Sequence, residues 1–136
     1  MKNVRVAFDI LEDGRNIEPG RVYLECYMVF DVKMDFTRKA RFVANGAKTP
    51  DLENTYAGVV SRETVRISFV YAALNGLDVM AGDVKNAYLT APSSEKYWTV
   101  CGPEFGPDLQ RSKALIVRDL YGTNCAGRDF RNHLRS

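Results

Sequence analysis

Apolar residues occupy every second position of residues 22–36, and most positions between them are polar or tyrosine. A period of two is typical of a strand that buries one face. Because a single strand of that length would be unusual, we expect a break near Glu25 or Asp31. Residues 35–38 then predict a turn into a second strand, K-A-R-F-V-A, over residues 39–44. The pattern therefore predicts a β-hairpin.

Helical spacing appears in other stretches. Residues 2–12 carry apolar side chains at i, i+3, i+4 and i+7, which predicts a short amphipathic helix. Ser61 is placed to cap a second helix, and Glu63 lies in its first turn, where a carboxylate complements the helix dipole. That helix has one apolar face and is expected to end at the Asn-Gly pair of residues 75–76. A polar segment at the end of the sequence predicts the last helix.

Three apolar runs complete the expected elements. Residues 77–84 predict a mostly buried strand, and residues 96–101 and 114–117 predict two more. Residues 47–60 are expected to form a loop. The resulting order, α-β-β-α-β-β-β-α, indicates an α+β fold class rather than a regular βαβ alternation. At 136 residues the chain is expected to form a single domain.

Composition narrows the class of protein. The net charge of +2 is compatible with nucleic-acid binding but does not argue for it, because clear binders are usually more basic. Cys26, Cys101 and Cys125 are scattered without metal-site spacing, which predicts reduced thiols inside a cell. The sequence has neither a long apolar run nor a signal-peptide pattern, so we expect a soluble, intracellular protein with no membrane partner.

Asp83 closes the apolar run of residues 77–84 and has two interpretations. It could cap a short helix that starts near Lys85. It could instead bind Mg²⁺, which prefers one or two carboxylates together with substrate phosphates. A Mg²⁺-dependent phosphotransfer domain centred on Asp83 is disfavoured because no second acid or base stands close to it in the sequence, but partners could come from distant segments.

Lys39 and Arg41 are two residues apart on a predicted strand and so project from the same face, while Ala40 and Phe42 are expected to face the core. They could form an ordinary solvated face or a cationic fork for phosphate, which suits the planar guanidinium of arginine. Neither G-x-G-x-x-G nor the Walker pattern G-x-x-x-x-G-K-[ST] is present. Phosphate binding by a glycine-rich loop of these types therefore has no support.

Four longer motifs occur in order along nearly the whole chain. They are K-A-R-F-V-A-N-G, V-V-S-R-E-T-V-R-I-S-F-V-Y-A-A-L-N-G, G-D-V-K-N-A-Y-L and V-R-D-L-Y-G-T-N-C-A-G-R-D-F. Together they resemble the reverse transcriptase domain of copia-type LTR retrotransposons. The third motif is the most specific, since it matches the family's D-V-K-N-A-F-L almost letter for letter.

The resemblance implies roles for particular residues. Asp83 would be the first catalytic carboxylate of an RNA-directed DNA polymerase and would bind both Mg²⁺ ions, with the Val84 carbonyl helping one of them. Tyr88 would lie beneath the incoming sugar and reject a 2′-hydroxyl. The remaining implied contacts are triphosphate ligation by Lys39 and Arg41, phosphate contact by the backbone near Asn86 and Ala87, and positioning of template and nucleotide by Tyr121, Gly122 and Gly127.

The resemblance also implies an architecture and partners. Residues 1–60 would be fingers-like and residues 61–136 palm-like, as part of the right-hand fold of polymerases. The fingers hairpin and an incomplete antiparallel palm sheet would pack on helices, and the helix of residues 61–76 would lie against both. Expected partners are an RNA or DNA template-primer, dNTPs, and the remainder of the polyprotein with the rest of the palm, the thumb and RNase H.

The chain also departs from the family pattern. It contains no Asp-Asp pair, and it stops at Ser136 before the hairpin that would carry one. Residues 123–126 read T-N-C-A instead of L-K-Q-A, and Asp129-Phe130 replaces A-W. We therefore expect a truncated fragment, inactive alone, found in the cytoplasm or nucleus with retrotransposon particles. An alternative is a non-catalytic nucleic-acid-binding or structural remnant, and an unpaired sheet edge would favour self-association.

Overall fold

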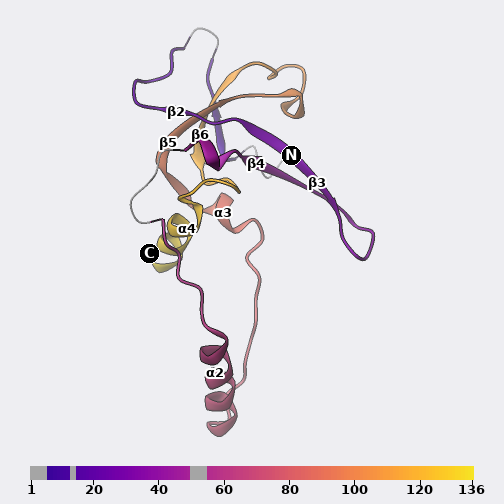
Figure 1. Cartoon of the computed structure of the whole chain (residues 1–136), viewed down its shortest axis with the longest axis vertical. Coiled ribbons are helices and arrows are strands. Elements are labelled where there is room, and N and C mark those ends of the chain that lie inside the picture. Colours follow the sequence, from indigo (N-terminus) through magenta and orange to yellow (C-terminus); the bar gives the residue numbers. More distant parts are fainter. Residues whose placement is uncertain (1–5, 13–14, 50–54) are drawn as a thin grey trace.

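The computed structural model describes residues 6–12, 15–49 and 55–136 (Figure 1). Its elements in these residues are β1 (Phe8–Ile10), β2 (Val22–Tyr23), β3 (Cys26–Val32), β4 (Arg38–Ala44), the 3₁₀ turn η1 (Gly46–Lys48), α2 (Arg62–Leu74), α3 (Ala87–Thr90), β5 (Pro92–Val100), the 3₁₀ turn η2 (Pro103–Phe105), β6 (Lys113–Arg118) and α4 (Ala126–Arg135). The chain is thus a mixture of strands and helices.

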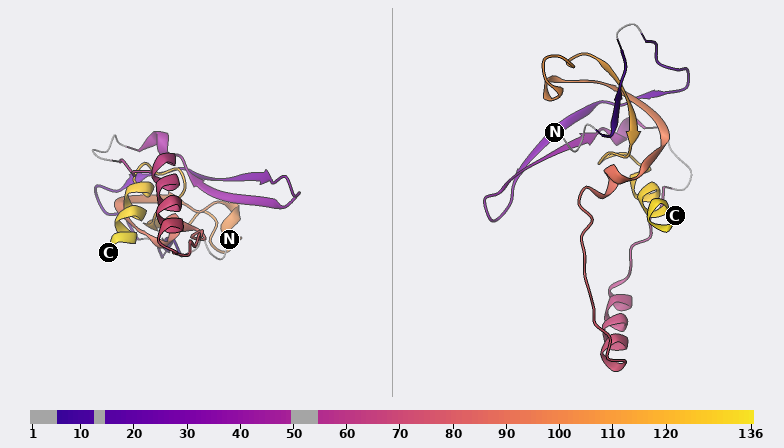
Figure 2. Two further views of the ribbon diagram at one scale, coloured as in Figure 1. Left: turned by 90° about the horizontal axis from the view of Figure 1, so that it is seen from below. Right: turned by 180° about the vertical axis from the view of Figure 1, so that it is seen from behind.

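The strands form two separate sheets. One has the order β1-β6-β5-β2, in which β2 runs parallel to β5 and the other neighbours are antiparallel. The other sheet is a two-stranded antiparallel ribbon of β3 and β4, which projects from the body of the molecule (Figures 1 and 2). Within residues 61–136, β5 and β6 pair in the expected antiparallel way, but β2, from the part expected to be fingers-like, joins the same sheet in parallel to β5.

The predicted hairpin is confirmed. The alternating stretch breaks between β2 and β3 at residues 24–25, which include Glu25, one of the two expected positions, and the turn lies at residues 33–37. The Asp35 side chain accepts a hydrogen bond from the Thr37 N–H at 3.0 Å, which is a usual way for aspartate to fix a turn. The loop expected at residues 47–60 contains only η1 among the residues that are described, since residues 50–54 lie outside them.

Three aromatic rings join the ribbon to the four-stranded sheet. Phe42 of β4 contacts Phe8 of β1 and Phe105 of η2 in edge-to-face arrangements, each with ring centroids 5.7 Å apart, and Phe8 and Phe105 lie 5.2 Å apart. Such pairs add about 0.5–1.5 kcal/mol each beyond the area they bury. The base of the ribbon is therefore fixed to the core, while its tip projects into solvent.

The prediction of a helix over residues 2–12 is wrong in the part that is described, since Phe8–Ile10 form strand β1. β1 pairs with the edge of β6, and Leu11 N–H donates to the Lys113 carbonyl at 2.9 Å. Residues 1–5 lie outside the described residues. A short segment has little helical stability of its own, so pairing with β6 and burial of Phe8 decide its conformation.

The prediction of a buried strand over residues 77–84 is also wrong. The segment is extended but belongs to no sheet, and Met80 is 96% exposed. A strand needs a neighbour for its backbone N–H and carbonyl groups, and no described strand lies alongside this one. The apolar character of the run indicates burial, but the described chain provides no surface to cover it.

Helix α2 forms where the sequence predicts it. The Ser61 side chain accepts a hydrogen bond from the Thr64 N–H at 3.1 Å, and the helix ends at Asn75 before Gly76, whose φ is +62°. Its position contradicts our expectation, because α2 lies apart from both sheets at the end of two extended connections (Figures 1 and 2). Apolar side chains on it remain in solvent, including Leu74 at 81% exposed.

The later elements agree with the sequence. β5 and β6 cover the two apolar runs expected as strands, and α4 is the polar helix at the end of the sequence. The core lies between the four-stranded sheet, α3 and the base of the ribbon, and Tyr97 and Leu120 are among its buried residues. Of the helices in the described residues, none has the length and apolar character needed to cross a membrane.

Candidate functional site

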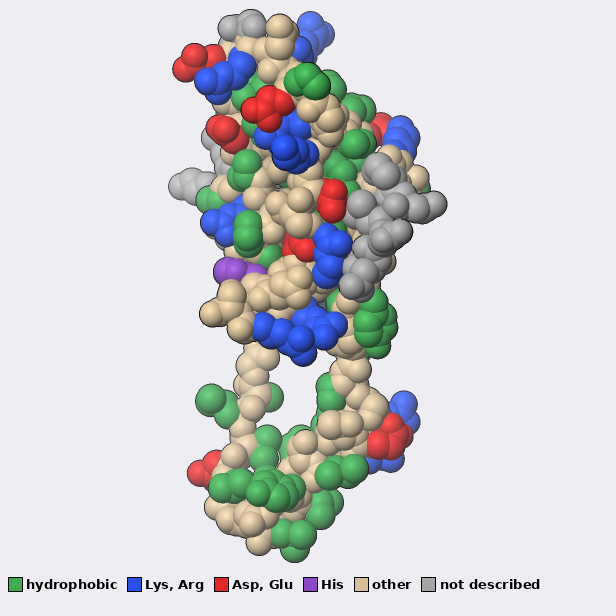
Figure 3. All heavy atoms as spheres, turned by 90° about the vertical axis from the view of Figure 1, so that its left-hand side faces the viewer, with side chains coloured by type: hydrophobic (Ala, Val, Ile, Leu, Met, Phe, Trp, Pro, Cys, Tyr) green, Lys and Arg blue, Asp and Glu red, His purple; other side chains and the backbone are tan. Residues whose placement is uncertain are grey.

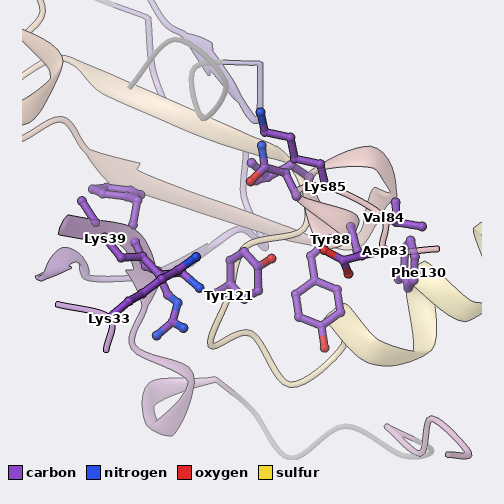
Figure 4. A pocket seen from close by; sticks show the side chains of 14 residues that line it. Lys33, Lys39, Asp83, Val84, Lys85, Tyr88, Tyr121 and Phe130 are labelled. Carbon is purple, nitrogen blue, oxygen red and sulfur yellow. The ribbon is translucent and has the colours of Figure 1, made fainter. Parts of the chain in front are cut away.

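A cleft of about 690 Å³ separates the ribbon from the segment that leads into α3. Its walls come from the ribbon, from residues 83–89, from the loop after β6 and from α4 (Figure 4). The lining residues include eight with predicted site roles: Lys39, Arg41, Asp83, Val84, Asn86, Ala87, Tyr88 and Tyr121. Residues that are far apart in the sequence therefore meet around one space.

Asp83 lies on the wall of the cleft opposite the ribbon, beside Tyr88 and Phe130 (Figure 4). The alternative role as a helix cap is wrong, because α3 begins at Ala87 and its N-cap is Asn86, in the left-handed conformation with φ of +55°. Asp83 is exposed and makes no salt bridge with any residue in the described part of the chain. Its charge is therefore available to a ligand in the cleft.

The ribbon contributes positive charge. Lys39 and Arg41 both line the cleft, and the alternation of side chains along β4 puts them on the same face of the strand. Phe42 on the other face is buried in the core, but the expectation for Ala40 is wrong, because that residue is exposed where the ribbon extends past the core. The body of the protein covers only the base of the ribbon.

Sequence reasoning missed two further cations. Lys33 at the turn of the ribbon and Lys85 beyond Asp83 also line the cleft (Figure 4). In the sequence, the only sign that Lys33 and Lys85 belong to this site is that they lie near Lys39 and Asp83 along the chain, and that sign is weak. The cleft therefore carries four cations and one carboxylate, and none of the cations is in a salt bridge with a described residue.

Aromatic rings form the middle of the cleft. Tyr88 packs against Tyr121, with centroids 4.9 Å apart and ring planes at 58°, and against Phe130, with centroids 6.0 Å apart and planes at 80°. In Figure 4 the two tyrosines lie between the ribbon cations and Asp83. A flat ring between an acid and a group of cations is a suitable surface for a sugar or a base.

Gly122 does not line the cleft but packs behind it, against Ala44 at the end of the ribbon. Its φ is +96°, and a Cβ at this position would lie 2.1 Å from the Ala44 carbonyl oxygen. The close approach lets the Ala44 N–H donate to the Tyr121 carbonyl at 2.8 Å. Only glycine fits here, and the contact sets the position of Tyr121 relative to the ribbon.

Gly127 is also outside the cleft. It lies in α4, where a Cβ would come within 3.1 Å of the Ala57 side chain. It therefore packs α4 against the chain that leads toward α2. Direct positioning of a template or nucleotide by Gly122 or Gly127 finds no support in this arrangement.

The residues present do not fit two Mg²⁺ ions. Asp83 is the single carboxylate that lines the cleft among the described residues, with Val84 beside it. Two ions that clamp the attacking and leaving oxygens of a phosphoryl transfer need more protein ligands than one carboxylate and one carbonyl. The cleft can hold the anionic groups of a ligand through its cations, but it lacks the acids for two-metal catalysis.

Comparisons with known proteins identify relatives among retrotransposon polyproteins of Saccharomyces cerevisiae. The chain is 28% identical over 127 residues, or 91% of its length, to a truncated transposon Ty1-A Gag-Pol polyprotein and to the transposon Ty1-BL Gag-Pol polyprotein. It spans 10% and 7% of the length of these two relatives. No family model and no solved structure matches. The matches support a copia-type retrotransposon origin for this chain.

Proposed function

We propose that the chain forms the fingers and the first half of the palm of a copia-type reverse transcriptase, and that its cleft binds the incoming deoxynucleoside triphosphate. The observation that carries this proposal is the shared cleft. Asp83 and the ribbon cations Lys39 and Arg41 line one space, with Tyr88 between them. An arrangement with the acid and the cations on opposite faces would have ruled the proposal out.

Each wall of the cleft would contact a different part of the nucleotide. The guanidinium of Arg41 and the ammonium of Lys39 suit the triphosphate, because charge-assisted hydrogen bonds to phosphate are stronger than neutral ones. The ring of Tyr88 is held between two other aromatic rings and would lie under the sugar, where it leaves little room for a 2′-hydroxyl. Asp83 would be the catalytic carboxylate beside the reacting phosphate, as the resemblance implies.

We propose that the larger polyprotein, rather than this chain alone, carries out the complete activity, RNA-directed DNA polymerisation. The remainder of the palm would add the missing acids and would also cover the apolar side chains of α2 and the extended residues 77–84. The two connections to α2 leave an open space beside the body, and apolar side chains gather on the helix (Figure 3). The retrotransposon origin supports a site of action inside the cell, with the element's particles.

Nucleotide binding tests the proposal. We expect a fluorescently labelled dGTP to bind the chain, measured by anisotropy, and K39A and R41A each to weaken binding about tenfold, as loss of a charge-assisted phosphate contact would. K113A is the matched control, since Lys113 is an exposed cation of β6 that does not line the cleft. Equal affinities of K39A, R41A and K113A would contradict the proposal.

The excess of cations over acids in the cleft also favours a second candidate, a non-catalytic remnant that binds nucleic acid. This function predicts binding of a single-stranded RNA oligonucleotide with strong salt dependence, and no preference for dGTP. In both cases the isolated chain should not extend a primer with dNTPs and Mg²⁺, because one carboxylate cannot hold two ions. Templated extension that is lost in D83N would show that the chain alone is active.

A further inference from the structure

A second group of polar side chains is buried beneath α4, and none of its members lines the cleft. Asp119 follows β6, Cys125 immediately precedes α4, and Asp129 lies in the first turn of that helix. One ligand atom from each side chain lies within 4.8 Å of the other two, and all three residues are buried. Two of them, Cys125 and Asp129, stand where the chain departs from the family's L-K-Q-A and A-W motifs.

Asp119 is buried and makes no salt bridge with a residue in the described part of the chain. Its side chain is inaccessible to solvent, its Oδ1 accepts a long hydrogen bond from the Cys125 Sγ at 3.5 Å, and its Oδ2 has no hydrogen-bond partner within 3.5 Å among the described residues. Burial, and then the charge of Asp129, raise the pKa of Asp119 to about 6. Hydrogen bonds from Ser93 and Cys125 and the charge of Arg128 lower this pKa in turn, but they do not outweigh burial. A cation bound directly to the carboxylate would compensate the cost of burying its charge.

Asp129, in contrast, is held in one orientation. Its Oδ2 accepts hydrogen bonds from the Ser94 N–H at 2.9 Å and the Ser94 hydroxyl at 2.6 Å, and its Oδ1 accepts one from the Arg128 Nε at 2.9 Å. Burial alone would raise the pKa of Asp129, but these contacts outweigh it and keep the pKa below its ordinary value. Contacts of this kind orient the carboxylate ligands of metal sites.

The Tyr97 hydroxyl is an independent sign of a missing ligand. The residue is 1% exposed, and its oxygen has no hydrogen-bond partner in the described part of the chain. Burial, and then the charges of Cys125, Glu95 and Asp119, raise the pKa of Tyr97 to about 12. A buried hydroxyl normally finds a hydrogen-bond partner, so the Tyr97 oxygen, like Asp119 Oδ2, is free to contact a bound group.

We propose that Asp119, Cys125 and Asp129 bind one divalent ion of the zinc class, with the Tyr97 oxygen or a water as the fourth ligand. The 3.5 Å between Asp119 Oδ1 and Cys125 Sγ matches the spacing of about 3.5 Å between two ligands of a tetrahedral zinc ion. A thiolate with carboxylates favours Zn²⁺ or Co²⁺ over Mg²⁺. On binding, Cys125 releases its thiol proton to solvent and the thiolate coordinates the ion.

One member of the cluster is reached from the surface of the molecule. A surface hollow of about 340 Å³ reaches Asp129 between the start of β5 and the end of α4, and Ser94 and His133 are among its other lining residues. The ion would join β5, the loop after β6 and α4, and so would fix the helix that carries Phe130 into the cleft. The inference does not depend on nucleotide binding.

Cobalt titration of the metal-free chain tests the site, because a thiolate bound to Co²⁺ gives a charge-transfer band in the near ultraviolet. We expect the band to saturate at one equivalent of Co²⁺, to disappear on addition of Zn²⁺, and to be absent in C125S. C101S is the matched control, since Cys101 is equally buried but lies outside the cluster, and it should retain the band.

The thermal midpoint gives a second measurement that does not depend on the thiolate. Zn²⁺ should raise the midpoint of the wild-type chain and of C101S but not that of D119N, which keeps the shape of the side chain and removes its charge. Absence of the band in folded wild-type chain, or a band that persists in C125S, would overturn the proposal. Equal stabilisation of D119N by Zn²⁺ would also overturn it.

Discussion

The Tyr88 and Tyr121 rings lie 4.9 Å apart at an angle of 58°, although they come from distant motifs of the sequence. Tyr88 is in α3, and Tyr121 follows β6 and bonds through its carbonyl to Ala44 at the end of the ribbon. The contact therefore connects the wall that carries Asp83 with the ribbon that carries the cations. The two walls of the cleft are thus held together by direct packing between these rings.

Truncation of Tyr88 should destabilise the protein. Y88A removes the contacts with Tyr121 and Phe130, and we expect a loss of about 2 kcal/mol in the free energy of unfolding, because the ring is only half-buried. Y88F keeps the ring and should cost less than about 0.5 kcal/mol. Urea denaturation measures both variants, and similar losses for the two would show that the hydroxyl, rather than the ring, stabilises this site.

Gly122 should be intolerant of a methyl group. G122A combines a positive φ with a Cβ that would lie 2.1 Å from the Ala44 carbonyl oxygen, so we expect a loss of more than about 3 kcal/mol. G20A is the matched control: its φ of +87° is similar, but nothing lies within 4 Å of its Cβ, and strain alone should cost about 1 kcal/mol. If both variants lose the same amount in urea denaturation, the contact with the ribbon does not matter.

The exposed apolar side chains of α2 should cause self-association. Ile67 and Leu74 are 68% and 81% exposed, and we expect the double variant I67E/L74E to shift the chain toward monomer in sedimentation velocity. R66E is the control with the same change in net charge and no loss of apolar surface, and it should behave as wild type. If R66E gives the same shift, charge repulsion and not the apolar surface controls association.

Cys26 should react slowly with alkylating agents. Burial raises the pKa of its thiol to about 11, with smaller contributions from nearby charges. Compared with the ordinary value near 9.0, a shift of this size leaves about 100-fold less thiolate at pH 8. Mass spectrometry after iodoacetamide should find Cys26 unmodified in the native chain and fully modified in urea. Rapid labelling of native Cys26 would show that its burial is transient.

Local pattern was sufficient for several elements. The period of two predicted the ribbon and its break beside Glu25, and the Ser61 cap predicted where α2 begins, because both signals act between residues close in the sequence. The same alternation placed Lys39 and Arg41 on one face of β4. These features depend on neighbouring residues only, so the sequence determined them without knowledge of the fold.

Other features depended on contacts with distant segments of the chain, which the local sequence pattern does not specify. Phe8 lies in a strand rather than a helix because the edge of β6 pairs with it, and residues 77–84 have no strand neighbour within the described ranges despite their apolar run. The contact of Gly122 with the ribbon and the cluster around Asp119 also join segments far apart in the chain. Hydrogen bonding and burial between distant segments are properties of the assembled molecule, so only the tertiary structure decided them.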